Sequence, residues 1–216
     1  SKSDKVDVVL TNPPFGGEEE KRIQANFPAD KQTAETSWLF LQLVIRRLKD
    51  GGRCAMVVPN GILFGDGVGA RVKQQLLAEC NLHTIVRLPD GVFEPYTAIP
   101  SNLLFFDKTG PTKDVWFYEI APPAGRKKYS KTKPMRFEEF AGCQAWWGDR
   151  SEGERAWRVP VAAVEDNGFS LDLRNPHRLE DLSHRPPSEL VADLLATERM
   201  ILELLQQLDG ELGEGS

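Results

Sequence analysis

Four residues near the start of the chain, Asn12, Pro13, Pro14 and Phe15, combine the groups that would act on a planar amine. The Asn12 side chain offers an amide oxygen and Pro13 offers a backbone carbonyl, and both oxygens accept hydrogen bonds. Phe15 offers an aromatic face on which a flat ring can stack. Two such acceptors bind the N–H groups of an amine, so the chemistry open to this motif is the positioning of a planar ligand.

The element before this motif is a short apolar segment. Residues 6–10 are suited to a buried strand, with Asp7 as the one polar residue. Pro13 and Pro14 then remove backbone donors and fix two φ angles, so the chain leaves the sheet in one rigid direction. A plain surface turn is the alternative, but an Asn-Pro-Pro-aromatic run at the end of a buried strand favours a functional site.

The elements that must position this motif alternate between strand and helix patterns. Strands are predicted over 6–10, 53–59, 83–89, 101–107 and 115–120, and helices over 35–52, ending at Gly51-Gly52, and 68–80. Strands separated by helices predict a mainly parallel α/β sheet. The glycine-rich run GDGVGAR at 65–71 is interpreted as the start of the second helix, with a phosphate contact from Arg71 or Lys73 as the weaker alternative.

The composition divides the chain into three parts. Residues 1–108 hold the α/β pattern, and 109–187 are expected to form an appended subdomain with a basic loop and a core around Trp146, Trp147 and Trp157. Residues 188–216 are predicted to be an amphipathic helix and a disordered tail. The apolar stripe of that helix is predicted at Leu190, Leu194, Ile201, Leu204 and Leu208.

The overall composition excludes several classes of protein. The chain is 40% hydrophobic and 27% charged, and no apolar run approaches the ~20 residues of a membrane span, so a cytoplasmic protein is expected. Three cysteines and three histidines show no ligand spacing, so no metal site is predicted. The net charge of −5 is negative, as is that of nucleic acid, so the overall charge does not favour binding. If the chain acts on nucleic acid, a partner is expected to supply much of the binding.

The motif resembles the catalytic motif of amino-group methyltransferases that use S-adenosylmethionine. The segments VVPNGILF and LPDGVFEPYTAIPSNLLFF resemble the modification subunit of bacterial type I restriction-modification systems, and this likeness runs over residues 6–136. The resemblance implies methylation of N6 of adenine in double-stranded DNA. It implies that Asn12 and Pro13 orient the amine and that Phe15 stacks on the flipped base. The implied partners are a specificity subunit and a restriction subunit.

The resemblance also implies a missing part. Methyltransferases of this family bind the cofactor through a glycine-rich loop and an acidic residue that both precede the Asn-Pro-Pro strand. The cofactor-binding residues are therefore expected upstream of Ser1, and the chain is expected to be the second half of a Rossmann-like sheet that is inactive alone. Two alternatives stay open: a protein-glutamine N5 methyltransferase, which carries a similar motif, and a non-catalytic assembly module that docks on a specificity subunit through residues 188–208.

One local segment is basic in this acidic chain. The residues predicted to contact the DNA backbone are Arg126, Lys127, Lys128, Lys131 and Lys133, with Tyr129 among them and Arg136 at the end of the run. A solvated loop is an equally open interpretation. For the C-terminal helix, docking on the specificity subunit is favoured over packing on its own domain.

Overall fold

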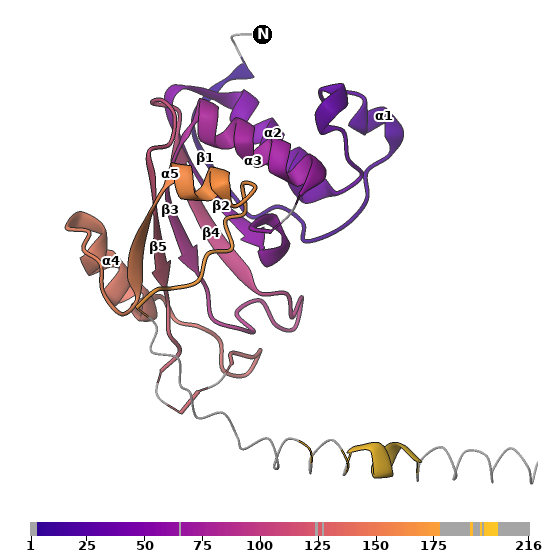
Figure 1. The fold of residues 1–216 in the computed structure, drawn as a ribbon, viewed down its shortest axis with the longest axis vertical. Coiled ribbons are helices and arrows are strands. Elements are labelled where there is room, and N and C mark those ends of the chain that lie inside the picture. Colours follow the sequence, from indigo (N-terminus) through magenta and orange to yellow (C-terminus); the bar gives the residue numbers. More distant parts are fainter. Residues whose placement is uncertain are drawn as a thin grey trace, which may run out of the picture. The chain divides into compact units, whose positions relative to one another are not determined.

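One six-stranded sheet organises the protein (Figure 1). The computed structural model describes residues 4–64, 66–123, 125–126, 128–177, 191, 195 and 197–202. The strands are β1 (Val6–Thr11), β2 (Leu48–Pro59), β3 (Asn81–Arg87), β4 (Ser101–Asp107), β5 (Asp114–Glu119) and β6 (Ala156–Pro160), in the spatial order β1-β2-β4-β3-β5-β6. The helices are α1 (Lys21–Gln24), α2 (Thr36–Arg47), α3 (Gly67–Glu79), α4 (Ala141–Gly148) and α5 (Val161–Asp166), with 3-10 turns at Ala29–Lys31, Asn60–Ile62 and Phe137–Phe140.

The sheet is mixed, so the prediction of a mainly parallel sheet is wrong. β1 pairs with β2 and β3 with β5 in parallel, whereas β4 runs antiparallel to both β2 and β3, and β6 runs antiparallel to β5. The reason lies in the connection between β3 and β4, residues 88–100, which contains no helix. A parallel return needs a crossover of a dozen or more residues that is usually helical. Without one, β4 turns back and enters the sheet between β2 and β3.

The first long helix ends earlier than the sequence predicts. It stops at Arg47, and β2 begins at Leu48, which is fully buried and pairs with Val6. Gly51 and Gly52 therefore lie inside a strand. Gly51 has φ +77°, and a Cβ on Gly52 would lie 2.9 Å from the Lys49 carbonyl oxygen, so the two glycines allow the irregular pairing at the start of β2. The glycine pair marks a bulge and not a helix end.

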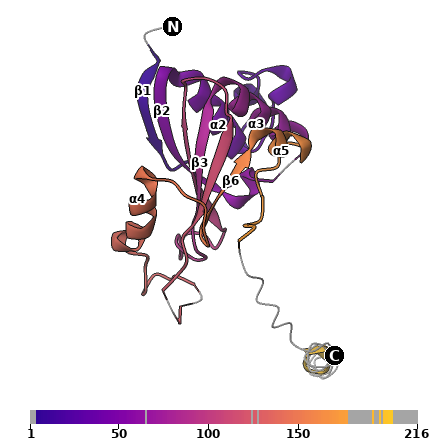
Figure 2. The same ribbon diagram turned by 60° about the vertical axis from the view of Figure 1, so that its left-hand side comes forward.

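The two faces of the sheet are covered differently. α2, α3 and α5 lie over one face, and α4 lies over part of the other (Figure 2). The main core lies under the first set of helices and includes Leu41, Ile45, Met56 and Phe106, each no more than 1% exposed. Trp157 belongs to this core and stacks on Phe117 at a ring separation of 5.0 Å. Trp157 is therefore a core residue, but the prediction that it shares a subdomain core with Trp146 and Trp147 is wrong, because those two residues pack against a different cluster.

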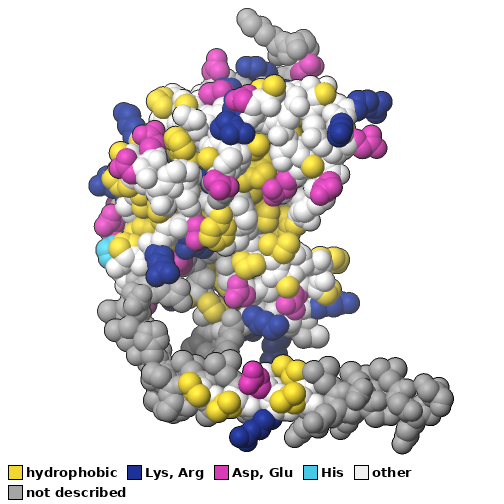
Figure 3. Space-filling model, turned by 45° about the vertical axis from the view of Figure 1, so that its right-hand side comes forward, with side chains coloured by type: hydrophobic (Ala, Val, Ile, Leu, Met, Phe, Trp, Pro, Cys, Tyr) yellow, Lys and Arg dark blue, Asp and Glu magenta, His cyan; other side chains and the backbone are white. Residues whose placement is uncertain are grey.

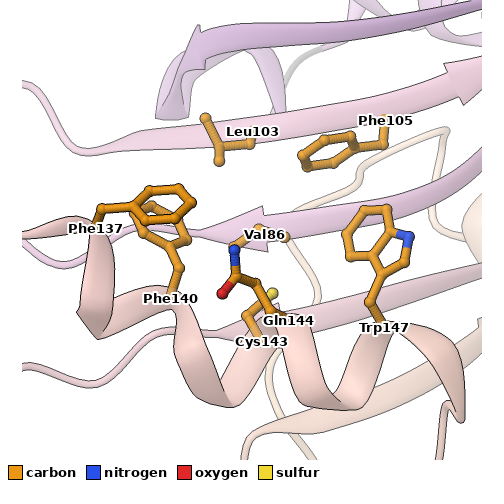
Figure 4. A pocket seen from close by; sticks show the side chains of 8 residues that line it. All are labelled: Val86, Leu103, Phe105, Phe137, Phe140, Cys143, Gln144 and Trp147. Carbon is orange, nitrogen blue, oxygen red and sulfur yellow. The ribbon is translucent and has the colours of Figure 1, made fainter.

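α4 packs a smaller apolar cluster onto the second face. Figure 4 shows Leu103 and Phe105 of β4 opposite Phe140 and Trp147 from the α4 side of a cavity of about 360 Å³. Trp147 makes an edge contact with Phe105 at 4.7 Å. Trp146 and Trp147 both pack against this cluster, as expected for structural tryptophans.

The compact unit extends over residues 1–178, and residues 179–216 form a second unit. β5 and β6 share the sheet of β1 to β4, and the division into parts at residues 108 and 187 stays a prediction. In the second unit, 191, 195 and 197–202 are helical, and Ile201 is 51% exposed. Leu190, Leu194, Leu204, Leu208 and the predicted disordered tail lie outside the described residues. Within the described residues, no helix has the length and apolarity to cross a membrane.

Candidate active site

The carboxyl ends of four strands lie together at one end of the sheet. This carboxyl edge is distinct from the side of the sheet that β1 forms. β1 and β2 run parallel, β4 reverses the direction, and β3 reverses it again, so β3 and its parallel neighbour β5 point the same way as β1. The loops that leave this edge follow β1, β2, β3 and β5. In open α/β sheets, ligands bind outside the carboxyl ends of the strands. The sequence motif is therefore at the edge where a site is expected.

The motif residues follow β1 directly. Asn12 and Pro14 are exposed, Pro13 is buried and Phe15 is half-buried. The chain beyond them is fastened to the start of α2, where the Thr36 backbone N–H donates to the Gly17 carbonyl at 3.2 Å. The buried Pro13 and this hydrogen bond hold the segment from both sides, which leaves the Asn12 side chain facing solvent on a fixed backbone.

Phe15 meets an aromatic partner from another loop. The ring of Phe93, in the connection between β3 and β4, lies with its centroid 5.4 Å from that of Phe15, and the two planes are at 89°. This edge-to-face arrangement is a favoured aromatic geometry. It supports the Phe15 ring from one side, three residues after Asn12 in the chain. A planar ring is the natural ligand for such a pair.

The connection that carries Phe93 is fastened at several points. The Glu94 N–H donates to the Gly91 carbonyl at 3.1 Å and the Thr97 N–H donates to the Phe93 carbonyl at 3.1 Å, which folds the chain into a compact turn. At the far end, the Asn60 N–H donates to the Pro100 carbonyl at 2.8 Å. The Asn102 side-chain amide donates to Asn60 Oδ1 at 3.1 Å. The loops after β2 and β3 are therefore tied together.

Gly91 lets a third loop approach. Its φ is +77°, and a Cβ at this position would lie 2.3 Å from the Tyr129 carbonyl oxygen, so only glycine fits. Tyr129 is fully buried, and its N–H donates to the Asp90 carbonyl at 2.9 Å. Its hydroxyl donates to Glu139. Burial and this carboxylate raise the pKa of Tyr129 to about 12, and the hydroxyl hydrogen bond lowers the pKa of Glu139.

Tyr129 anchors the predicted DNA-binding segment beside the site. Arg126 lies over the Tyr129 ring at 4.9 Å and 4.0 Å from Glu139 Oε1. Lys128 Nζ lies 3.6 Å from Glu94 Oε1, while Lys131 and Lys133 are exposed. Lys127 lies outside the described residues. The structure thus brings the basic segment next to the Phe93 loop, and its contact with DNA stays a prediction.

Within the glycine-rich run at 65–71, Gly69 and Arg71 contact neighbouring elements of the fold. Gly69 packs under Trp38, where a Cβ would lie 2.7 Å from the indole. The Arg71 guanidinium donates to the Asp30 carbonyl, and the fully buried Lys73 donates to the Leu63 carbonyl at 3.1 Å. Burial lowers the pKa of Lys73 to about 8. The buried Lys73 is out of reach of a phosphate, so that alternative is wrong, whereas a phosphate contact from the exposed Arg71 stays a prediction.

One face of β1 is apolar and uncovered in the described residues, so the prediction of a buried strand is wrong. Val6, Val8 and Leu10 alternate along the strand and are 41%, 54% and 84% exposed. Leu10 pairs with Ala55 of β2, which pairs with Phe105 of β4, so these side chains share the face that α4 covers only in part. Hydrophobic side chains also gather along the face drawn in Figure 3. Isolated apolar residues on a surface are ordinary, but a continuous strip marks an interface.

Phe93 and Gly91 are the residues that sequence reasoning missed. The signal that points to them is positional: residues 88–100 follow a strand with the same direction as β1, so they leave the sheet at the edge that carries Asn12. That deduction needs the strand order, since a loop after an antiparallel strand would leave from the opposite edge. Periodicity alone does not provide the order.

A mixed α/β sheet with an Asn-Pro-Pro-aromatic segment at the carboxyl end of a strand is the arrangement that the resemblance to amino-group methyltransferases predicts. The sequence profile described as N-6 DNA Methylase matches residues 1–185. The chain belongs to this family, as the resemblance predicts.

Relatives of known sequence support the same assignment. The chain is 52% identical over 217 residues to the type I restriction enzyme EcoEI methylase subunit of Escherichia coli, covering 97% of this chain and 44% of that protein. It is 32% identical over 179 residues to the EcoKI methylase subunit of Escherichia coli strain K12, covering 76% of this chain and 33% of that protein. The chain therefore spans less than half the length of these relatives.

Solved structures give the same picture. A modification subunit of a type I restriction enzyme from Vibrio vulnificus YJ016 matches with a TM-score of 0.80 and 54% identity, over 85% of this chain and 41% of that one. A chain solved in the context of complex assembly of the type I R-M system matches with a TM-score of 0.78 and 43% identity, over 99% of this chain and 46% of that one.

The contact between Gly91 and Tyr129 generates a prediction. Gly91→Ala forces a Cβ into the Tyr129 carbonyl and strains a left-handed backbone, so we expect the free energy of unfolding in urea to fall by about 1–3 kcal/mol. Gly153→Ala is the matched control, because a Cβ at that position would meet nothing within 4 Å and its φ is ordinary. Equal stability of the two variants would contradict the close packing of Tyr129 on Gly91.

Proposed function

We propose that this chain is the target-base portion of a DNA adenine-N6 methyltransferase, the modification subunit of a type I restriction-modification system. The observation that carries the proposal is the contact of Phe15 with Phe93 in the segment that carries the exposed Asn12, at the carboxyl edge of the sheet. The family assignment and the type I relatives support it. The substrate is double-stranded DNA from which one adenine is extruded, since its N6 atom is out of reach inside the duplex.

The motif residues act on the amine by position. The N6 lone pair of adenine is delocalised into the ring, so the amine is a weak nucleophile. Asn12 Oδ1 and the Pro13 carbonyl accept hydrogen bonds from the two N–H groups of the amine and so favour a tetrahedral nitrogen. Pro14 keeps the segment rigid. Phe15 stacks on the extruded ring, and Phe93 supports Phe15 from the side. After methyl transfer the nitrogen is cationic and loses its proton to water, so no side chain needs to act as a base.

S-adenosylmethionine supplies the electrophilic methyl group in this reaction. We assign no cofactor-binding residue among the described residues. β1 is the first strand in the order of the described sheet, and its side chains are exposed and apolar. An edge strand of this kind favours pairing with a further strand, which supports a continuation of the sheet by another segment. This chain would then be the second half of a Rossmann-like sheet, with the cofactor held mainly by the segment that pairs with β1.

DNA contact is assigned to the basic segment around Tyr129. Arg126, Lys128, Lys131 and Lys133 lie on or beside a loop that is fastened to the Phe93 connection, so a phosphate bound there would lie near the extruded base. Lys127 belongs to the same segment in sequence. The net charge of −5 limits the grip of this chain alone, and a specificity subunit is assigned the reading of the sequence.

The principal test is substitution of Asn12 in the assembled modification enzyme. Asn12→Ala removes an acceptor that matters most in the transition state, so we expect methyl transfer to fall by at least about a hundredfold with unchanged DNA affinity. Asn12→Asp keeps an acceptor and serves as the matched control, retaining more activity than Asn12→Ala. Phe15→Ala should reduce both transfer and base extrusion, whereas Phe15→Tyr should be tolerated. Full activity of Asn12→Ala would refute the proposal.

The open edge of β1 generates a second test. We expect the 216-residue chain by itself to bind S-adenosylmethionine with a dissociation constant far weaker than micromolar, measured by calorimetry. The assembled enzyme is the positive control. Micromolar or tighter binding by the isolated chain would place the cofactor site within it and contradict the assignment to a separate segment.

The second unit is proposed to dock on the specificity subunit. Val191, Leu195, Met200, Ile201 and Leu202 are apolar helical residues that are 49–63% exposed. Ile201→Asp combined with Leu204→Asp should leave the unfolding transition of the α/β unit unchanged and abolish co-purification with the specificity subunit, because each buried aliphatic side chain contributes ~1.5–3 kcal/mol. Glu198→Ala is the control and should co-purify normally. Global unfolding of the double variant would contradict a docking role.

A further inference from the structure

The tip of the connection between β3 and β4 is apolar and exposed. Residues 95–100 carry no charge, although 27% of the chain is charged. The exposed members are Pro95, Tyr96, Ala98, Ile99 and Pro100. The Tyr96 side chain is 93% exposed, and that of Ile99 is 46% exposed. One exposed apolar residue needs no explanation, but this apolar tip is a run of them beside the candidate site.

The apolar tip is held in a defined position. The Tyr96 and Thr97 N–H groups donate to the Phe93 carbonyl at 2.9 and 3.1 Å, so Tyr96 is one turn away from the ring that supports Phe15. The Ile99 N–H donates to Thr97 Oγ1 at 3.1 Å. The Asn60 N–H fixes the Pro100 carbonyl. Tyr96 thus projects from a backbone that is braced against the same site.

Lys128 cancels the negative charge of Glu94 next to the apolar tip, which removes a source of repulsion for an anionic partner. Glu94 is the one carboxylate between Gly91 and Pro100, and Lys128 Nζ lies 3.6 Å from it. The basic segment therefore borders the tip and offsets its negative charge. A surface that joins apolar side chains to cations beside a base-binding aromatic pair matches DNA better than a purely apolar protein surface.

We propose that Tyr96 inserts into the duplex beside the extruded adenine and fills the gap that the base leaves in the stack. This inference rests on the proposed function, because it requires an extruded base. Extrusion breaks stacking on both faces of the adenine, and an apolar or aromatic side chain placed in the gap restores part of it. Phe15 and Tyr96 then have complementary parts: one holds the base outside the duplex, and the other keeps the duplex from closing.

The test compares two duplexes in the assembled modification enzyme. With a fully paired target adenine, Tyr96→Ala should slow single-turnover methylation by about tenfold or more, in line with the loss of one aromatic–base stack. It should also reduce the emission of 2-aminopurine placed at the target position. With an abasic site opposite the target adenine, extrusion costs less, so the same variant should lie within about threefold of the unsubstituted enzyme.

The control variants distinguish insertion from a general loss of activity. Tyr96→Trp should retain activity, and Phe137→Ala, which removes another ring that is 71% exposed, should have no effect. An equal loss on both duplexes, or no loss on the paired one, overturns the proposal. Reduced assembly with the specificity subunit also overturns it and assigns the tip to a protein contact. Asn12→Ala runs in parallel: if it stays active, the proposed function fails, whereas an inactive Asn12→Ala with an unaffected Tyr96→Ala refutes only the insertion.

Discussion

The antiparallel entry of β4 between β2 and β3 is the constraint on which the site depends. Because β4 reverses the chain direction and β3 reverses it again, β1, β2, β3 and β5 all end at one edge. Asn12 and Phe93, more than 80 positions apart in the chain, leave the sheet from that edge. A helical crossover in place of the turn at 88–100 would remove the contact between Phe15 and Phe93.

The loops at the carboxyl edge are held by hydrogen bonds and close packing to one another or to α2. The segment after β1 is pinned to α2, the segment after β2 is tied to Pro100 through Asn60, and the segment after β5 packs against Gly91 through Tyr129. Each contact uses backbone groups or a glycine that cannot be replaced without strain. In the proposed reaction the amine must be held in place and needs no acid–base group, and fixed loops at the carboxyl edge suit that requirement. The exposed cations and the apolar tip lie on these same loops.

The two faces of the sheet in the compact unit are covered to different extents. Its core under α2, α3 and α5 is closed, with buried Trp157 stacked on Phe117, whereas the opposite face is covered by α4 only in part and β1 exposes Leu10. Burial of such apolar surface stabilises a protein by roughly 25 cal/mol per Å², so the uncovered strip is a place where a further segment gains most by packing. This asymmetry agrees with relatives that are more than twice as long.

The sequence by itself determined the local features: a strand that runs into Asn12 to Phe15, the strand at 101–107, a strand within one residue of β5, the helix before Cys80 and the structural role of the tryptophans. These follow from periodicity and proline chemistry, which act over a few residues. Only the tertiary structure decided the order and direction of the strands, the bulge at Gly51-Gly52, the contact of Phe93 with Phe15 and the close packing of Tyr129 against Gly91. The physical reason is that strand pairing and close backbone contacts join residues far apart in the chain, and no pattern within a short window encodes which of them meet.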